Sequence, residues 1–275
     1  MFSIALCLCA CASRIAHTEN GEHANTLVLH EDLVLGLDEN PPIGRVADVA
    51  VDSKGNIYVL DVGFDVIRKY TANGRFIGDL SGEGEAPGYF YAPTRMAFGP
   101  DDRLYVGGRT TIITILTPDG SPAGQIKRNF SGTLLSIAID AKGNVYTVAS
   151  DVWERKVIHK YDASTHEYVG SFCDSWAVGN DVDARLEHLH AGGAIDIGAD
   201  GLLYFVQRTP QEVRIFTLDG GLVATHAARR AESLVPSDPN YLEDGARFAA
   251  AQTVSGSMVC LPNGNYLTSG KCQAL

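Results

Sequence analysis

Basic residues, cysteines and long apolar runs are all scarce in this sequence. Its 22 Lys and Arg are outnumbered by 33 Asp and Glu, giving a formal net charge of −11. An acidic surface repels phosphate backbones, so we expect no nucleic-acid partner. No apolar run reaches the ~18 residues that a membrane-spanning helix needs. The sequence also lacks G-x-S-x-G, P-loop and C-x-x-C motifs, so no local pattern marks a hydrolase, nucleotide or zinc site.

Only three of the six cysteines lie in the body of the chain, at Cys173, Cys260 and Cys272. An odd number does not build a disulfide framework. Cys260 and Cys272 would be free to pair in an oxidising compartment, but single thiols are the favoured interpretation.

The other three cysteines belong to a short apolar N-terminal segment, residues 1–11, which resembles the hydrophobic region of a signal peptide. Its end, Leu8-Cys9-Ala10-Cys11, resembles a bacterial lipobox, whose last cysteine carries the lipid. We therefore expect Cys11 to be lipidated, residues 1–25 to be signal and tether, and the protein to be exported to the cell envelope. The alternative is a buried, cysteine-rich first strand.

A repeated unit dominates the rest of the chain. The unit recurs five times. It consists of a short strand with alternating apolar residues, a turn rich in Asp, Asn and Gly, and a second strand with an aromatic residue. The aromatic positions are Tyr58, Tyr105, Tyr146, Tyr204 and Tyr266. Periods of this size mark solenoids, propellers or arrays. We expect the tyrosines to be core residues and the turn aspartates, at positions 52, 101, 102, 140 and 200, to stabilise turns.

A third and a fourth strand follow most copies of the unit. The third strands are expected at residues 67–70, 113–116, 157–161 and 213–216. In three copies an Asn-Gly or Asp-Gly turn leads into the fourth strand, as in tight antiparallel hairpins, and in the third copy the turn, residues 162–167, is longer. Four antiparallel strands per repeat predict an all-β fold, a β-propeller, because solenoids use shorter coils or helices that this pattern lacks.

The segment Gly82–Pro93 reads G-E-G-E-A-P-G-Y-F-Y-A-P and resembles the connection between blades of the NHL repeat. Residues 26–275 are similar in layout to bacterial six-bladed propeller lipoproteins of the NHL or TolB-like kind. The resemblance implies six blades, of which four and a half are visible. The favoured interpretation is a truncated six-bladed protein. The alternative is a five-bladed ring closed by strands at residues 26–30 and 33–35.

Two pairs of residues are candidates for a ligand site. Asp48 and Arg95 precede inner strands and are expected to lie near each other at the channel mouth, as ligand-binding residues or as an inter-blade salt bridge. His188 and His190 share one face of an extended segment, which suits a ligand or metal, although no third ligand is fixed by spacing. We therefore predict no metal site, and a solvated loop is the favoured interpretation of the histidine pair.

Such propellers host unrelated functions, so the repeat does not name an activity. We predict a non-enzymatic binding or scaffold module for a protein, peptide or glycan, presented chiefly by the long connections 173–192 and 226–255. The alternative is a propeller lyase or lactonase with a divalent cation such as Ca²⁺ in its channel. The absence of histidine from every recognisable inner strand counts against lyase chemistry. No cofactor is otherwise expected.

Overall fold

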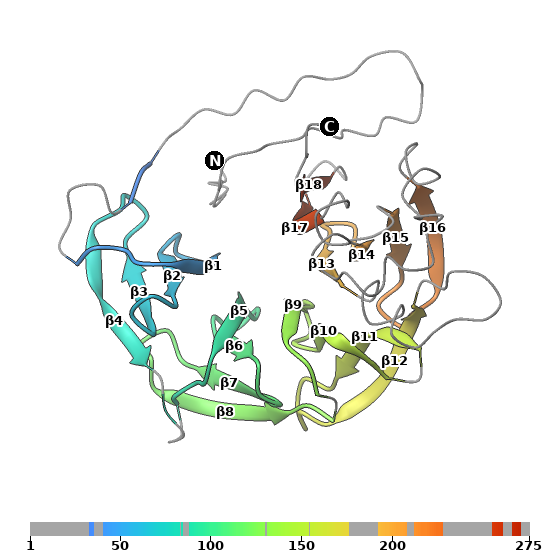
Figure 1. Cartoon of the computed structure of the whole chain (residues 1–275), viewed down its shortest axis with the longest axis horizontal. Coiled ribbons are helices and arrows are strands. Elements are labelled where there is room, and N and C mark those ends of the chain that lie inside the picture. Colours follow the sequence, from blue (N-terminus) through green and yellow to red (C-terminus); the bar gives the residue numbers. More distant parts are fainter. Residues whose placement is uncertain are drawn as a thin grey trace, which may run out of the picture. The chain divides into compact units, whose positions relative to one another are not determined.

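The computed structural model describes residues 33–35, 41–82, 84, 88–129, 131–153, 155–175, 192–207, 212–227, 255–260 and 266–270. All regular structure among them is β-strand (Figure 1). Among these residues there is accordingly no helix of the length and apolar character that crosses a bilayer.

The strands form four four-stranded sheets and one two-stranded sheet, in the sequence order expected for blades. The first sheet contains β1 (Val46–Val51), β2 (Ile57–Asp61), β3 (Val66–Tyr70) and β4 (Phe76–Gly82). The second contains β5 (Pro93–Phe98), β6 (Leu104–Gly108), β7 (Ile112–Leu116) and β8 (Pro122–Lys127). Each strand pairs antiparallel with the next, so the predicted third and fourth strands are confirmed in both sheets.

The remaining sheets repeat the arrangement. The third contains β9 (Leu134–Ile139), β10 (Val145–Trp153), β11 (Lys156–Tyr161) and β12 (Tyr168–Asp174). The fourth contains β13 (Gly193–Ile197), β14 (Leu203–Gln207), β15 (Glu212–Phe216) and β16 (Leu222–Ala227). The last pair is β17 (Ser255–Cys260) and β18 (Tyr266–Gly270). Four complete blades and a two-stranded fifth sheet therefore match the predicted repeat.

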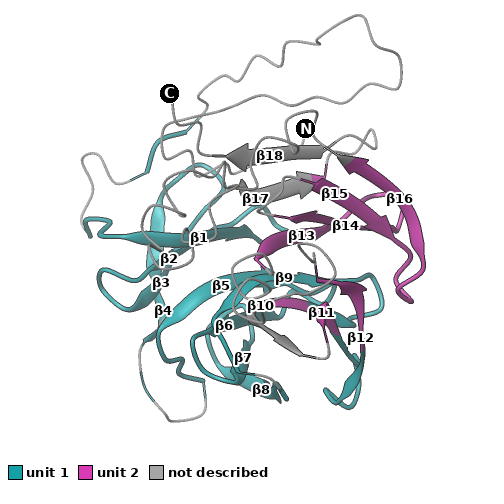
Figure 2. Ribbon diagram, turned by 45° about the vertical axis from the view of Figure 1, so that its right-hand side comes forward, with its two compact units in different colours: residues 1–7, 28–146, 160–170 teal, residues 8–27, 147–159, 171–275 magenta. Residues whose placement is uncertain are grey.

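The chain divides into two compact units, coloured separately in Figure 2. The larger described part of unit 1 covers 41–146 and 160–170, and unit 2 covers 147–159 and the described residues from 171 onward. In unit 1, β1 contacts β5 and β5 contacts β9, so the first strands of successive sheets are neighbours. In unit 2, β13 contacts β17 in the same way. Adjacent first strands are the inner strands of propeller blades.

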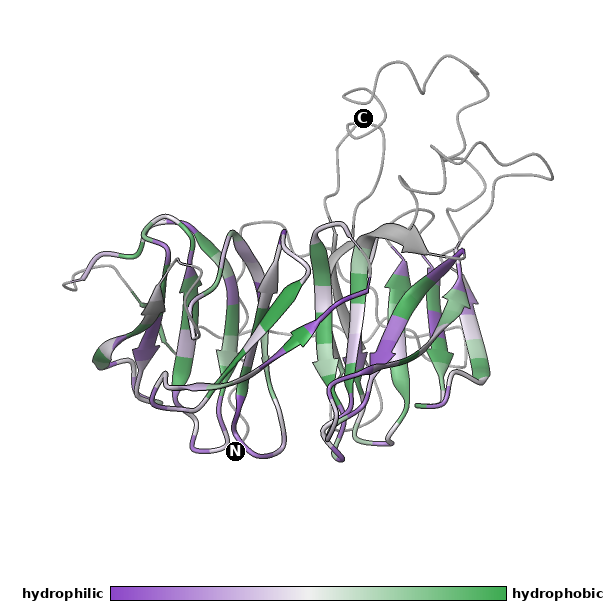
Figure 3. Ribbon diagram, turned by 90° about the horizontal axis from the view of Figure 1, so that it is seen from below, coloured by the Kyte–Doolittle hydropathy of each residue, from purple (hydrophilic) through white to green (hydrophobic). Residues whose placement is uncertain are grey.

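Within each unit, the core clusters lie between the faces of successive sheets. One cluster joins Tyr58 and Leu60 to Met96 and Val106, and another in unit 1 includes Tyr105. In Figure 3 the apolar colour follows the strands, whereas many turns are hydrophilic. Tyr58, Tyr105, Tyr146 and Tyr204 are all at most 5% exposed. Their predicted core role is confirmed, and Tyr266 lies on a strand whose side chains are outside the described set.

The first turn of a blade is held by one aspartate. Asp52 Oδ1 accepts the backbone N–H groups of Lys54 (3.0 Å) and Asn56 (2.8 Å), and Oδ2 accepts the side-chain amide of Asn56 (2.8 Å) and the hydroxyl of Tyr58 (3.2 Å). Asp140 makes the same four kinds of contact with Lys142, Asn144 and Tyr146. The predicted turn role of these aspartates is confirmed, and the local hydrogen bonds account for it fully.

The segment expected to supply a closing strand differs from its prediction. Leu33–Leu35 is described and forms no strand. A Cβ atom added to Gly74 would lie 2.8 Å from Leu33 Cδ1 and 3.1 Å from Leu35 Cδ2, so these leucines pack on the β3–β4 turn. The alternating leucines that predict a strand pack against this turn instead. Residues 26–30 are outside the described residues.

Candidate functional site

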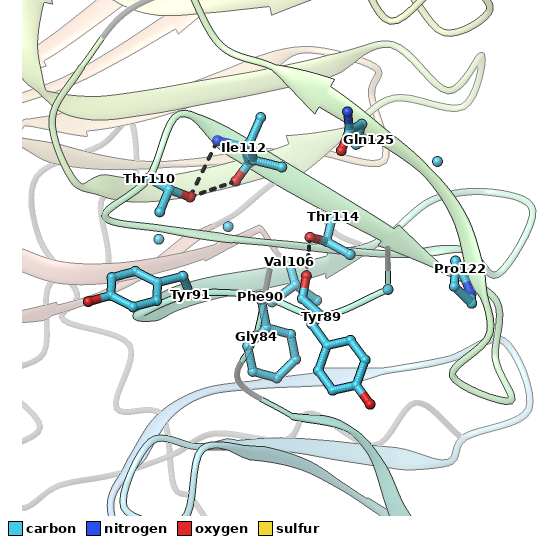
Figure 4. Close-up of a pocket in the computed structure, with 14 residues that line it drawn as sticks. Gly84, Tyr89, Phe90, Tyr91, Val106, Thr110, Ile112, Thr114, Pro122 and Gln125 are labelled. Carbon is cyan, nitrogen blue, oxygen red and sulfur yellow. Dashed lines mark hydrogen bonds between the residues drawn. The ribbon is translucent and has the colours of Figure 1, made fainter. Parts of the chain in front are cut away.

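A cavity of about 610 Å³ lies beside the second blade in unit 1 (Figure 4). One wall is the connection from β4 to β5, through Gly84 and residues 88–91. The opposite wall comes from β6, β7 and β8, including Val106, Thr114 and Gln125. Its volume is in the ~300–1,000 Å³ range of ligand pockets. None of its described lining residues carries a charged side chain.

The connecting segment is fixed by backbone hydrogen bonds and one buried ring. Gly84 N–H donates to Phe90 O (3.0 Å), and Phe90 N–H donates to Gly82 O (3.4 Å). The Phe90 side chain is 4% exposed and belongs to the core cluster between the first two blades. Thr114 on β7 donates its hydroxyl to Tyr89 O (2.8 Å). These contacts fix Gly84, Tyr89 and Phe90 between the first two blades, as expected for a connection between them.

Two glycines let the segment approach its neighbours closely. A Cβ on Gly84 would lie 3.0 Å from the Tyr89 ring, so the ring packs directly on this glycine. Gly88 has φ +90°, where a side chain is strained, and a Cβ there would lie 2.6 Å from Pro122 Cγ. Glycine is therefore required at position 88 for the cavity to have this form, whereas a side chain at position 84 would push the Tyr89 ring outward by a few tenths of an ångström.

Burying Phe90 leaves its two neighbours at the surface of the cavity. Tyr89 is 47% exposed and Tyr91 is 56% exposed, and Figure 4 shows their rings projecting from the segment on either side of Phe90. Gln125 is exposed on β8. Among the described residues, none of these three side chains has a hydrogen-bond partner. Two exposed aromatic rings and one exposed amide thus border a cavity whose described lining carries no charge, which suits a ligand that is held by stacking and hydrogen bonds.

Asp48 and Arg95, the pair expected at the inner strands, lie close together in unit 1 but form no ion pair with each other. Asp48 Oδ2 accepts the backbone N–H of Met96 (2.9 Å), and its Oδ1 accepts that of Val49 (3.0 Å). Burial raises the pKa of Asp48 to about 6, although the Met96 hydrogen bond and the Arg95 charge oppose this rise. The carboxylate therefore ties β1 to β5.

The Arg95 guanidinium binds backbone carbonyl groups of three inner strands. Nε donates to Leu135 O (2.7 Å), and Nη1 donates to Thr94 O (2.6 Å) and Ala47 O (3.5 Å). These acceptors belong to β9, β5 and β1. Both side chains of the predicted pair are thus engaged in holding inner strands together, and whether either binds a ligand stays a prediction.

A second aspartate in unit 2 plays a similar part, and it was missing from the candidates. Asp196 Oδ2 accepts the backbone N–H of Cys260 (2.6 Å), which links β13 to β17, and Oδ1 accepts that of Ile197 (2.9 Å). Burial raises the pKa of Asp196. The available signal was an acidic residue within an otherwise apolar inner strand.

A buried ion pair in the first blade was also absent from the candidates. Asp61 is fully buried and Arg68 is 3% exposed. Arg68 Nε lies 3.2 Å from Asp61 Oδ2, and its Nη1 lies 3.2 Å from Asp79 Oδ1. Burial would raise the pKa of Asp61, but hydrogen bonds from Gly44, Arg68, Gly63 and Arg45 hold it below its ordinary value. This cluster has every partner it needs and serves the stability of the blade.

Several other predicted site residues lie outside the described residues. These are His188, His190 and Cys11, together with Cys272 and most of the connections 173–192 and 226–255. Within the described part of the chain, no group of three or more His, Cys, Asp or Glu side chains could hold a metal ion. Cys173 and Cys260 are free thiols there.

Comparison with known proteins supports the fold. No protein-family model and no curated protein sequence matches the chain. A catalytically inactive virginiamycin B lyase from Staphylococcus aureus, solved with quinupristin, is 15% identical with a TM-score of 0.56. The match covers 86% of this chain and 69% of that one. The WD40 β-propeller domain of Doa1 is 11% identical with a TM-score of 0.50, over 82% of this chain and 60% of that one.

The selenomethionine-substituted form of the Staphylococcus aureus lyase gives 13% identity and a TM-score of 0.53, over 80% of this chain and 61% of that one. At this identity the likenesses concern the fold alone. This chain spans about three fifths of the length of several of these structures. With its four-stranded antiparallel blades, the chain is a β-propeller.

Proposed function

We propose that this propeller is a ligand-binding module and that the cavity beside the second blade is its binding site. The observation that carries the proposal is the pair of exposed rings, Tyr89 and Tyr91, on a segment that Phe90 anchors in the core. Exposed aromatic side chains held on a rigid scaffold are typical of interfaces, because they bury a large area on binding and lose little conformational entropy.

The rigidity of the segment supports this assignment. Gly84 and Phe90 are joined by a backbone hydrogen bond, and Thr114 ties Tyr89 to β7. A ligand that stacks on the two tyrosines therefore meets a surface whose backbone is already fixed, which lowers the entropic cost of binding. The expected ligands are a protein, a peptide or a glycan, none of which needs a charged pocket.

Fluorine NMR of the full chain tests the site. Each of the eleven tyrosines is replaced by 3-fluorotyrosine, and Tyr89→Phe and Tyr91→Phe variants assign the two cavity resonances. A panel of short peptides and soluble oligosaccharides is then titrated in. We expect the Tyr89 and Tyr91 resonances to shift together at lower ligand concentration than those of buried Tyr58 and Tyr146. Ligands that shift only other tyrosines, or a panel without any effect, would contradict the proposal.

We propose further that the module is exported and carried on a membrane by a lipid at Cys11. The support is the apolar segment 1–11 with its lipobox-like end and the polar residues that follow. Intact-mass analysis of the membrane fraction tests this. The expected product is cleaved before Cys11 and carries added acyl mass, and Cys11→Ser abolishes both. An uncleaved chain without added mass would contradict lipidation.

A further inference from the structure

The cavity beside the second blade has free hydrogen-bond donors, whereas many of its acceptors are already occupied. From the two exposed tyrosine rings, these donors and the occupied backbone carbonyl groups we infer that its ligand is a proline-rich, extended segment of another protein. The inference rests on the proposed binding function and specifies its ligand.

The backbone carbonyl groups of the lining are largely taken. Tyr89 O accepts from Thr114, and Phe90 O accepts from Gly84. Arg128 Nη2 donates to Gly108 O (3.3 Å) and, through a shorter contact, to Thr110 O. A ligand that brings many N–H or O–H groups would leave them without acceptors at these positions, and an unpaired donor is costly to bury.

Arg128 adds an electrostatic preference. This side chain is 3% exposed, and its guanidinium also donates to Gly132 O (2.9 Å). No acidic side chain among the described residues forms an ion pair with it. Its positive charge therefore lies directly behind the carbonyl groups of Gly108 and Thr110, both of which line the cavity. That charge favours carbonyl oxygens in a ligand and disfavours ammonium groups.

The free side-chain groups on the other side can all donate a hydrogen bond. The hydroxyls of Tyr89 and Tyr91 and the amide of Gln125 have no partner among the described residues. Each provides at least one N–H or O–H, and the Gln125 amide oxygen and the two hydroxyl oxygens are the acceptors that remain. A segment in the polyproline II conformation is complementary to such a surface, since its carbonyl groups are unpaired and each proline lacks an N–H.

Shape and hydrophobicity agree with this ligand. Proline rings pack on aromatic faces, and aromatic-lined grooves are the established way to bind polyproline II segments. Pro122, exposed at the edge of β8, extends the apolar lining. A glycan would also stack on the tyrosines, but it brings many O–H donors, and the backbone carbonyl groups named above are already occupied.

Fluorescence anisotropy with a fluorescein-labelled decaproline peptide tests the inference, with a Gly-Ser decamer and an oligolysine decamer as comparison probes. We expect saturable binding of decaproline to the full chain at micromolar concentrations and no binding of the Gly-Ser peptide. Because neither the hydrogen-bond donors of Tyr89, Tyr91 and Gln125 nor the stacking rings carry a charge, raising the salt concentration leaves the decaproline affinity unchanged. Oligolysine binding that equals decaproline binding would indicate simple attraction to the acidic chain and overturn the inference.

Variants locate the contacts. Tyr91→Ala removes a stacking face and is expected to weaken binding tenfold or more, whereas Tyr91→Phe and Gln125→Ala each remove a hydrogen bond and weaken it by about 2- to 10-fold. Gln125→Glu replaces the amide donor by an acceptor with negative charge, so it weakens binding more than Gln125→Ala. Val169→Ala, at a 57% exposed position on β12 outside the cavity, is the matched control and leaves the affinity unchanged. Circular dichroism verifies that each variant is folded.

The outcomes separate this inference from the proposed function. If decaproline fails to bind while an oligosaccharide or another peptide shifts the Tyr89 and Tyr91 fluorine resonances, the cavity is a binding site and the ligand class is wrong. If decaproline binds but Tyr91→Ala and Gln125→Ala have no effect, the assigned location is wrong. If no probe affects the two tyrosines, the inference and the proposed function both fall.

Discussion

Met96 donates its backbone N–H to the Asp48 carboxylate over 2.9 Å, which joins the inner strand of the second blade to that of the first. Burial disfavours the charged form of the Asp48 carboxyl group and raises its pKa to about 6. In unit 2, Asp196 and Cys260 repeat this relationship over 2.6 Å. An aspartate on one inner strand and a backbone donor on the next thus recur as an inter-blade link.

The pH dependence of stability follows from the Asp48 pKa. Since the folded-state pKa of about 6 exceeds the ordinary 3.8, the folded protein binds this proton more tightly than the unfolded chain. The contribution of Asp48 to stability is therefore largest below pH 3.8 and falls as the pH rises to about 6. Asp48→Asn keeps an acceptor for Met96 without the charge. The measured quantity is the free energy of unfolding of the variant minus that of the natural protein, from urea titrations. We expect this difference to be higher at pH 7.5 than at pH 4.

Asp102 provides a control whose contribution to stability has the opposite pH dependence. Its carboxylate accepts the backbone N–H of Ser53 (2.9 Å) and the hydroxyl of Ser53, and these hydrogen bonds lower its pKa from 3.8. Its stabilising effect is present above pH 3.8 and is lost as the pH falls through the lowered value. Asp102→Asn should therefore destabilise the protein at pH 7.5 and have a smaller effect at pH 3. Parallel pH profiles for the two variants would contradict both assignments.

The Arg68 guanidinium is predicted to be essential to the first blade. Arg68→Met leaves the fully buried Asp61 carboxylate without its cation, and breaking such a pair costs about 3–5 kcal/mol of unfolding free energy. Because the pKa of Asp61 is lowered in the folded protein, the penalty should shrink as the pH falls below 3.8.

Arg103→Met is the matched comparison for that measurement. Arg103 pairs with Asp101 at 3.3 Å, but the two side chains are 46% and 51% exposed. Exposed pairs contribute about 0–1 kcal/mol, so urea denaturation should hardly distinguish this variant from the natural protein. Equal losses for the two arginines would show that burial does not set the importance of the Arg68 pair.

Gly88→Ala should disrupt the wall of the cavity. The residue has φ +90°, and the new Cβ would meet Pro122 Cγ at 2.6 Å. Strain of this kind costs about 1–3 kcal/mol. Adding Pro122→Ala relieves the contact but leaves the backbone strain, so the double variant should recover only part of the loss. A double-mutant cycle by thermal denaturation measures the two parts, and strict additivity would contradict the contact.

The Cys173 thiol is predicted to be unreactive in the folded protein. Burial raises its pKa from 9.0 to about 12, so at pH 8 the thiolate is roughly 1,000-fold rarer than for an ordinary cysteine. Burial and the neighbouring Asp196 raise the pKa of the Cys260 thiol as well. Mass spectrometry after brief iodoacetamide treatment should find Cys173 alkylated only when denaturant is present. Equally rapid labelling without denaturant would show that the thiol is accessible.

The sequence predicted the blades because their determinants are local. The turn at Asp52 needs only residues 52–58, and alternation alone buries Tyr58. The cavity could not be predicted in the same way, because Tyr91 and Gln125 are brought together by strand pairing across distant segments. The motif at 82–93 predicts a connection, but packing decides which of its three aromatic rings enters the core. Phe90 is buried, which leaves Tyr89 and Tyr91 exposed.

The hydrogen bonds of the first turns divide the blades into two alternating kinds. In the first and third blades the turn begins with aspartate, and Asp52 and Asp140 bind the tyrosine hydroxyl of the next strand. In the second and fourth blades Gly99 and Gly198 occupy that position, and the aspartate lies two residues later, where Asp200 binds Tyr204 over 2.7 Å. The same tyrosine hydroxyl can therefore be held by an aspartate at either of two positions in the turn.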